Sequence, residues 1–300
     1  MSKYKKSICL YTLNILILLF VFNGVVACGS QFYQISVKED FEPSAEVKAA
    51  NPGMEDPEST LYGIHAPSGF ENLPITIKLG EDMNEEQRIH FLAAIRVWEW
   101  AIGQNLFEYH GTHSGVSGDT FEDLFSSLDD NINGHYLDNN WGKTDKPNRV
   151  LATTIWTTTA DYSQVAKSDI RFNHERFVIA DSLIHSGTHS RDIVDMQSVA
   201  LHELGHLLGL AHIDAEVDSH SIMNPSLFIG EGLTSRRLSK GDIERIQLIY
   251  GCQGVACDID ELFKMTDSIH NSDGFENSAT LWLRSEEPSL SIQNLSDHQY

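Results

Sequence analysis

The stretch "SVALHELGHLLGLAH", residues 198–212, decides how the rest of the chain is interpreted. It places three histidines, one glutamate and two glycines in an apolar run that is otherwise typical of a buried helix. Residues i and i+4 of a helix lie on the same face, so His202 and His206 can direct two imidazoles at one ion. Buried polar groups are costly unless they are satisfied, and the spacing favours a metal site over a core helix with three hydrogen-bonded histidines.

Gly209 and His212 continue this pattern beyond the helix. Gly209 comes three residues after His206, and His212 comes three residues after Gly209. A glycine lets the helix end and the chain turn, so that a third histidine can reach the same ion. Three imidazole ligands with one open coordination position are typical of a catalytic zinc. Glu203, beside the first histidine, can reach a water molecule at that position without being a ligand.

A methionine follows in "SIMNP" (221–225), eleven residues after His212. A turn with methionine after H-E-x-x-H-x-x-G-x-x-H is the motif of the metzincins. The chain resembles the matrixin branch of these metallopeptidases, and especially its bacterial members. The resemblance lies in "DMQSVALHELGHLLGLAH", "SIMNPS" and "LSKGDIERIQLIYG". It covers about residues 70–251, with specific motifs only in 195–251.

The resemblance implies an α+β metzincin fold, in which a twisted mixed β-sheet packs on a long active-site helix and a C-terminal helix. It implies a zinc endopeptidase that binds one catalytic zinc and acts on a protein or peptide substrate. The implied site residues are the zinc ligands His202, His206 and His212, the general base Glu203, Met223 beneath the metal and Gly209 at the turn.

Substrate recognition is also implied by the resemblance. An extended substrate would lie beside an edge strand, which we expect within 176–183, and a side-chain pocket would be lined by residues from Asn224 to about Leu238. The chain departs from the matrixin pattern at Ile213, where serine is common. The cysteine-switch prosegment has no counterpart, since Cys28 is the only cysteine between the signal and the domain.

Additional metal ions have weaker sequence support. The nearest candidates for a second zinc site are His110, His113, His185 and His189, and we expect these to be loop histidines without metal. Asp129, Asp130 and Asn131 are candidate calcium ligands, but their spacing misses the EF-hand pattern and favours a solvated turn.

The N-terminal residues 1–27 predict an export signal. A basic start, "MSKYKK", precedes the apolar run "ICLYTLNILILLFVF", and "NGVVAC" then ends at Cys28. Residues 25–28 resemble a bacterial lipobox, which implies lipidation of Cys28 and a membrane anchor. An ordinary signal peptide or an uncleaved signal anchor would be the alternatives. We therefore expect a lipoprotein of the bacterial cell envelope, at the outer membrane or surface, or otherwise a secreted protein.

The remaining chain divides into a tether, a catalytic domain and an extension. We expect a flexible tether at 28–70, the metallopeptidase domain at 71–251 and a C-terminal extension at 252–300. Strands are predicted at 73–80, 105–111, 149–158 and 168–173, and helices at 84–103, from 195, and at 238–251. In the extension "ATLWLRS" (279–285) is a possible strand. Cys252 and Cys257 form either a local disulfide or two free thiols.

The charge balance limits the classes of partner. The formal net charge is −22, from 43 acidic and 21 basic residues, so the surface should repel nucleic acid. We expect a monomer that does not bind nucleic acid. Two alternatives to an endopeptidase stay open: a catalytically silent metzincin-fold binding lipoprotein, and a zinc hydrolase acting on another amide such as that of a cell-wall peptide.

Overall fold

The structure is a computed structural model that describes residues 44–126, 130–185 and 192–264. The predicted signal, Cys28 and "ATLWLRS" lie outside these residues. The described elements are α2 (Ala45–Ala50), β1 (Ile75–Gly80), α3 (Glu85–Ile102), β2 (Phe107–His113), β3 (Asn133–Leu137), η2 (Trp141–Lys143), β4 (Ala152–Thr158), β5 (Val165–Phe172), β6 (Val178–Ala180), β7 (Ile193–Asp195), α4 (Met196–Leu207), α5 (Lys240–Tyr250) and η3 (Gly254–Cys257). The expected mixed α+β architecture is confirmed.

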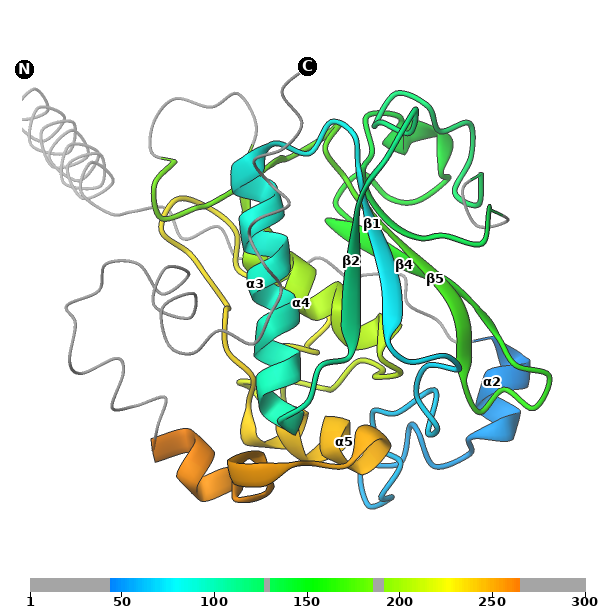
Figure 1. Cartoon of the computed structure of the whole chain (residues 1–300), viewed down its shortest axis with the longest axis vertical. Helices are drawn as coiled ribbons and strands as arrows, with labels where there is room; N and C mark the ends of the chain where they lie inside the picture. Colours follow the sequence, from blue (N-terminus) through cyan, green and yellow to red (C-terminus); the bar gives the residue numbers. More distant parts are fainter. Residues whose placement is uncertain (1–43, 127–129, 186–191, 265–300) are drawn as a thin grey trace, which may run out of the picture. The chain divides into compact units, whose positions relative to one another are not determined.

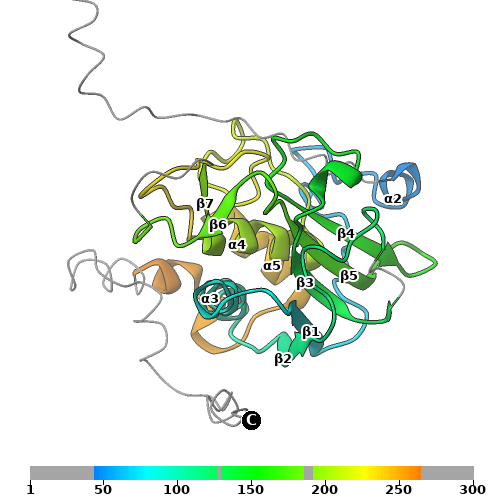
Figure 2. The same cartoon turned by 90° about the horizontal axis from the view of Figure 1, so that it is seen from above.

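A five-stranded mixed sheet carries the domain, in the order β2-β1-β3-β5-β4. Strand β4 runs antiparallel to β5 at the edge of this sheet, whereas the other neighbouring pairs are parallel. Helices α3 and α4 pack against each other beside the sheet (Figures 1 and 2). The short strands β6 and β7 pair with each other in a separate two-stranded sheet.

The sheet register determines which side chains face the helices. His135 of β3 pairs with Ile170 of β5, and Ile170 pairs with Thr154 of β4. Paired residues project from the same face of a sheet, so these three side chains share a face. His135 lies against Phe91 of α3 and Thr154 lies against Glu203 of α4, which identifies this face as the one covered by both helices.

Two helices begin and end at the residues that the sequence predicts. Asn84 and Gln87 form a capping box at the start of α3, and Gly103 ends that helix with a φ of 71°. Ser239 and Asp242 form the corresponding box at the start of α5. The hydroxyl or amide caps satisfy backbone N–H groups that have no partner within the helix. Both predicted helices are therefore confirmed.

The chain is ordered earlier than we expected. Residues 44–70, predicted as part of a flexible tether, include α2 and pack onto the domain, with Ile64 and Phe70 buried. Ile64 forms an antiparallel bridge with Leu210, and Phe70 forms a parallel bridge with Val165. The polar composition of this segment did not predict its ordered structure, because that order depends on backbone hydrogen bonds to distant residues.

Two strand assignments also differ from the sequence analysis. Strand β3 lies between the predicted strands at 105–111 and 149–158, where the sequence analysis predicts no strand. The predicted edge strand at 176–183 contains only the short β6, which pairs with β7 and not with the main sheet. The antiparallel edge strand next to α4 is β4 instead.

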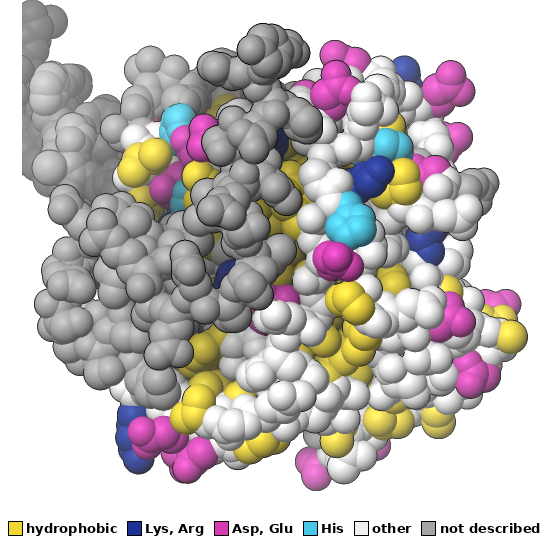
Figure 3. All heavy atoms as spheres, in the orientation of Figure 1, with side chains coloured by type: hydrophobic (Ala, Val, Ile, Leu, Met, Phe, Trp, Pro, Cys, Tyr) yellow, Lys and Arg dark blue, Asp and Glu magenta, His cyan; other side chains and the backbone are white. Residues whose placement is uncertain are grey.

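On the face shown in Figure 3, Asp and Glu side chains are spread out and not gathered into one patch.

Cys252 and Cys257 form a disulfide, which resolves the two alternatives left by the sequence. Within the described ranges, none of the helices has the length and apolar character needed to span a bilayer.

Candidate metal and active site

Helix α4 carries the first two histidines of the site and ends where the third must turn back. Asp195 caps its first turn by accepting a hydrogen bond from the backbone N–H of Ser198 at 3.0 Å. The helix ends at Leu207, and Gly209 has a φ of 104°. A Cβ on Gly209 would lie 2.7 Å from the carbonyl oxygen of Ala66. Gly209 is thus required by both its backbone conformation and its surroundings.

The chain turn brings three imidazole nitrogens together. The Nε2 atoms of His202, His206 and His212 lie 3.1, 3.2 and 3.3 Å from one another. Nitrogens at about 2.0–2.1 Å from a tetrahedral zinc ion would be about 3.3–3.4 Å apart. Within the described residues, this is the only cluster of three or more His, Cys, Asp or Glu side chains with such spacing.

Two of the rings are fixed in the tautomer that a metal site needs. The Nδ1 atom of His202 lies 2.6 Å from the carbonyl oxygen of Ile222, and that of His206 lies 2.8 Å from the carbonyl oxygen of Leu210. A carbonyl oxygen only accepts, so each Nδ1 donates and each Nε2 keeps its lone pair. Lone pairs this close repel one another unless a cation lies between them, and the three histidines therefore fit a zinc ion.

Glu203 lies beside the histidines and is fully buried. Its Oε2 accepts a hydrogen bond from the hydroxyl of Thr154 at 2.5 Å, and the same hydroxyl lies 3.1 Å from its backbone carbonyl oxygen. Strand β4 thus fixes both the side chain and the backbone of Glu203. A carboxylate held in this way can accept a proton from a molecule bound at the cluster.

Met223 lies directly against α4. A Cβ on Gly205 would be 2.3 Å from its sulfur, so the glycine allows this close approach. The methionine turn is held from α5, because Asp242 accepts hydrogen bonds from the Ser221 hydroxyl and the Ile222 N–H. Burial raises the pKa of Asp242 above its ordinary value, while these hydrogen bonds act in the opposite direction.

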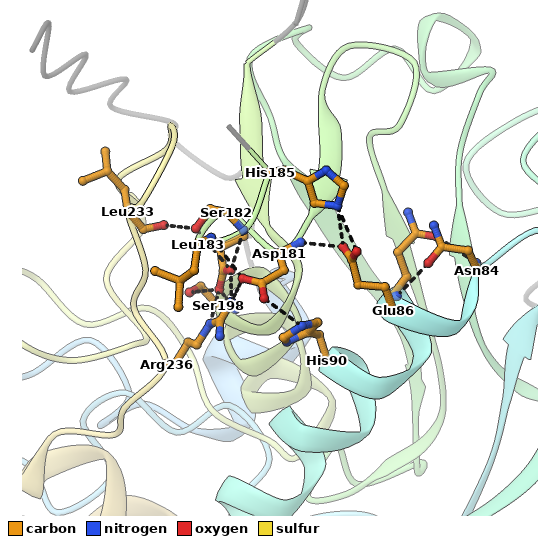
Figure 4. A network of polar contacts seen from close by, with 12 residues as sticks. Asn84, Glu86, His90, Asp181, Ser182, Leu183, His185, Ser198, Leu233 and Arg236 are labelled. Carbon is orange, nitrogen blue, oxygen red and sulfur yellow. Dashed lines mark hydrogen bonds and ion pairs between the residues drawn. The ribbon is translucent and has the colours of Figure 1, made fainter. Parts of the chain in front are cut away.

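The start of α4 is held by an ion-pair network that extends to α3 (Figure 4). Arg236 donates to both carboxylate oxygens of Asp195, at 2.9 and 2.5 Å, and to Asp181 at 2.5 Å. Burial alone would raise the pKa of Asp195, but Arg236 and Ser198 outweigh it and the pKa is lowered. The carboxylate of Asp181 also lies 3.2 Å from His90 of α3. The chain after the methionine turn is thus tied to the N-terminus of the active-site helix.

Two of the other candidate histidines, His110 and His113, lie in strand β2 and not in a loop as expected, and none of the described candidates belongs to a group of three or more metal-ligating side chains. His110 lies 3.2 Å from Glu108, His113 lies 2.7 Å from the Tyr136 hydroxyl, and His185 lies 2.9 Å from Glu86. His189 lies outside the described residues.

The calcium candidates are arranged differently from an oxygen cage. Asp130 lies 3.4 Å from the ammonium group of Lys167, and Asn131 has a φ of 59° at a bend of the chain. Calcium sites gather six to eight oxygen ligands, whereas Asp130 faces a cation. Asp129 lies outside the described residues.

Sequence reasoning missed several groups that hold the site. Three side chains donate to backbone carbonyl oxygens along α4 and its end, namely Trp98 to Leu201, His65 to His206 and Tyr250 to Leu208, and the Thr154 hydroxyl donates to the Glu203 carboxylate. These donors come from four separate segments. No local motif marks them, because each is recognised only by its position in the folded chain.

The histidine cluster, the buried glutamate and the mixed sheet together resemble the site of the zincin class of metallopeptidases. Residues 120–251, slightly less than half of the chain, match the family model for Matrixin. The chain is also similar to two proteins of Arabidopsis thaliana. It is 46% identical to Metalloendoproteinase 5-MMP over 77 residues, which cover 24% of this chain and 20% of that protein. It is 47% identical to Metalloendoproteinase 2-MMP over 58 residues, which cover 19% of this chain and 14% of that protein.

Within residues 120–251 the chain is thus similar to the matrixin family, and the described domain contains a cluster of three histidines that could hold a metal ion. The matched segment spans a fifth or less of the length of either plant relative.

Proposed function

We propose that the protein is a zinc-dependent endopeptidase that hydrolyses peptide bonds of extracellular or envelope proteins. The observation that carries this proposal is the triangle of three Nε2 atoms with sides of 3.1–3.3 Å beside the buried carboxylate of Glu203. Zinc held by His202, His206 and His212 would supply a Lewis acid for the peptide carbonyl and would lower the pKa of a water molecule there to about 7.

The protein's own residues supply the proton transfers. Glu203 accepts a proton from the attacking water, and it later returns that proton to the leaving amine. The Thr154 hydroxyl fixes the position of the Glu203 carboxylate by a hydrogen bond. Such a positioned base typically contributes about 10²–10⁴-fold to the rate.

The edge strand β4 is the proposed docking site for substrate. It is the last strand of the sheet order, and its Thr154 contacts Glu203. An extended peptide can add to a sheet edge through main-chain hydrogen bonds. Such a peptide would be placed beside the histidine cluster, and residues from Asn224 to about Leu238 would contact one of its side chains.

The cell envelope is the proposed location. The sequence before residue 44 supports this, because a basic start, an apolar run and a small-residue stretch precede Cys28. Replacing Cys28 by alanine should release the protein from the membrane fraction if Cys28 is lipidated. Continued membrane retention would instead indicate an uncleaved signal anchor.

A peptide-library assay tests the proposed activity. Purified protein is incubated with a mixed peptide library and with a cell-wall peptide, with zinc and with a chelator. We expect zinc-dependent cleavage of library peptides that the chelator abolishes. Zinc binding without cleavage would support a binding protein with a silent site, and cleavage of the cell-wall peptide alone would support the other amide hydrolase.

A further inference from the structure

The segment 61–66 packs against the loop that leads from α4 to the third histidine. The backbone N–H groups of His65 and Ala66 donate to the carbonyl oxygen of Gly209, at 2.8 and 3.1 Å. The N–H of Ala211 donates to the carbonyl oxygen of Gly63 at 2.8 Å. These hydrogen bonds are made by Gly209 and Ala211, the two residues that flank Leu210, and Ala211 directly precedes the third histidine. The loop that carries His212 is therefore held from outside by a distant part of the chain.

The side chain of His65 reaches the second histidine's backbone. It is fully buried, and its Nε2 lies 2.9 Å from the carbonyl oxygen of His206. Since a carbonyl oxygen only accepts, His65 donates this hydrogen bond. Its ring also packs on that of Trp156 in β4, with the centroids 4.8 Å apart. His65 thus connects the last turn of α4 with the edge strand.

Gly63 fits closely against the residue after the third ligand. It has a φ of 74°, and a Cβ at this position would lie 2.1 Å from the Cδ1 atom of Ile213. Any side chain here would push the segment away from the loop or force Ile213 to move. The N–H of Ile213 in turn donates to the carbonyl oxygen of Met223 at 2.9 Å.

Helix α2 and the residues after it hold this segment in place. The amide of Asn51 donates to the carbonyl oxygen of His65 at 2.9 Å. Val47 and Met54 form a small buried cluster with Ala211, which directly precedes His212. Residues 44–66 therefore contact the loop through both backbone and side chains.

We propose that residues 44–66 position the third metal ligand, and that His65 is the central positioning residue. This inference rests on the proposed zinc site. Without the segment, part of the binding free energy of the metal would be spent on ordering the loop at 209–213. Substitution of groups that orient metal ligands typically lowers metal affinity about 10–100-fold. The same segment would thus determine whether the site keeps its metal.

Zinc affinity of the full chain tests this role, measured by competition with a chromogenic chelator. His65→Phe keeps a ring of similar shape but removes the donor, and we expect at least about tenfold weaker zinc binding. His65→Gln retains an N–H donor at the same distance along the side chain, so its affinity should lie close to that of the unchanged protein. Gly63→Ala should also weaken binding. Glu58→Ala, an exposed change in the same segment, is the matched control and should have no effect.

The outcomes separate this inference from the proposed function. If the unchanged protein does not bind one zinc ion, the proposed function itself is overturned. If it binds zinc and both His65→Phe and Gly63→Ala bind equally well, the positioning role is overturned. Circular dichroism of the metal-free variants checks whether they fold. If His65→Phe does not fold, the zinc affinity of Gly63→Ala decides whether the positioning role holds. Cobalt absorption spectra provide a second readout, since displacement of His212 changes the coordination of the ion.

Discussion

Thr154 of β4 and Glu203 of α4 meet across the boundary between the sheet and the active-site helix. The Thr154 hydroxyl lies 2.5 Å from the Oε2 atom of Glu203 and 3.1 Å from its carbonyl oxygen. The two residues are 49 positions apart in the sequence. This contact links the edge of the sheet, where we propose that substrate binds, to the residue that we propose transfers the proton.

Replacing Thr154 tests the importance of that contact. Thr154→Val keeps the shape of the side chain but removes a hydrogen bond to a charged group, which is worth about 1.5–3 kcal/mol. We expect kcat/KM to fall roughly 10–100-fold, with zinc content unchanged. Thr154→Ser retains the hydroxyl and should keep most of the activity. Equal activity of the valine and serine variants would show that the contact has no role in turnover.

Gly205 allows Met223 to approach α4, and replacing this glycine by alanine should lower the stability of the fold. In Gly205→Ala the new Cβ would lie 2.3 Å from the Met223 sulfur and 3.1 Å from the Trp98 ring. Overpacking of this kind costs about 1–3 kcal/mol. We expect a lower unfolding midpoint in urea. Gly142→Ala, where the nearest atom to a new Cβ is 3.7 Å away, is the control and should leave the midpoint nearly unchanged.

Asp195 serves both as a helix cap and as the ion-pair partner of Arg236. Asp195→Ala should destabilise the fold by about 3–5 kcal/mol, because it leaves the largely buried Arg236 without a bidentate partner. Asn84→Ala removes the cap of α3 without breaking an ion pair, and it should cost about 1 kcal/mol. Denaturant unfolding measures both. A similar loss in the two variants would mean that the Arg236 pair contributes little.

His135 should make the folded protein sensitive to acid. It is fully buried, and neither ring nitrogen has a hydrogen-bond partner among the described residues. Burial lowers the pKa of His135 to about 3, whereas its value in the unfolded chain is about 6.5. As the pH falls below 6.5, the unfolded chain takes up a proton that the folded state excludes, so the folded state loses stability.

The size of this effect can be measured with His135→Leu. As the pH falls from 7 to 5, proton uptake by this histidine in the unfolded chain should lower the free energy of unfolding by about 2 kcal/mol. Without metal, the unfolding free energy of the unchanged protein should therefore drop by about that much more than that of the variant. Parallel pH dependence in the two proteins would show that His135 is solvated or protonated in the folded state.

The sequence was sufficient for those parts of the site that are local. His202 and His206 are one helical turn apart, and Gly209 marks the end of the same helix, so their geometry follows from the helical repeat alone. The capping boxes at Asn84 and Ser239 also follow from short-range spacing. These features were predicted because each depends on residues within a few positions.

The parts that were missed depend on contacts between distant segments. The order of residues 61–66 comes from backbone hydrogen bonds to residues 209–211, and backbone groups leave no mark in the sequence. Strand β3 was not expected because "NGHYL" carries a polar histidine at a buried position, which masks the apolar pattern of a strand. Likewise, no spacing rule connects Thr154 with Glu203. Which of these distant residues contact one another depends on burial and strand register, and both are known only from the fold.

The turnover of Glu203→Gln, measured on protein with one bound zinc per chain, tests the central claim most directly. Glutamine has nearly the same shape but cannot accept the proton, so zinc binding should be retained while kcat falls by about 10²–10⁴-fold. That result would assign the histidines to metal binding and the carboxylate to proton transfer. Unchanged kcat at full zinc occupancy would contradict the account.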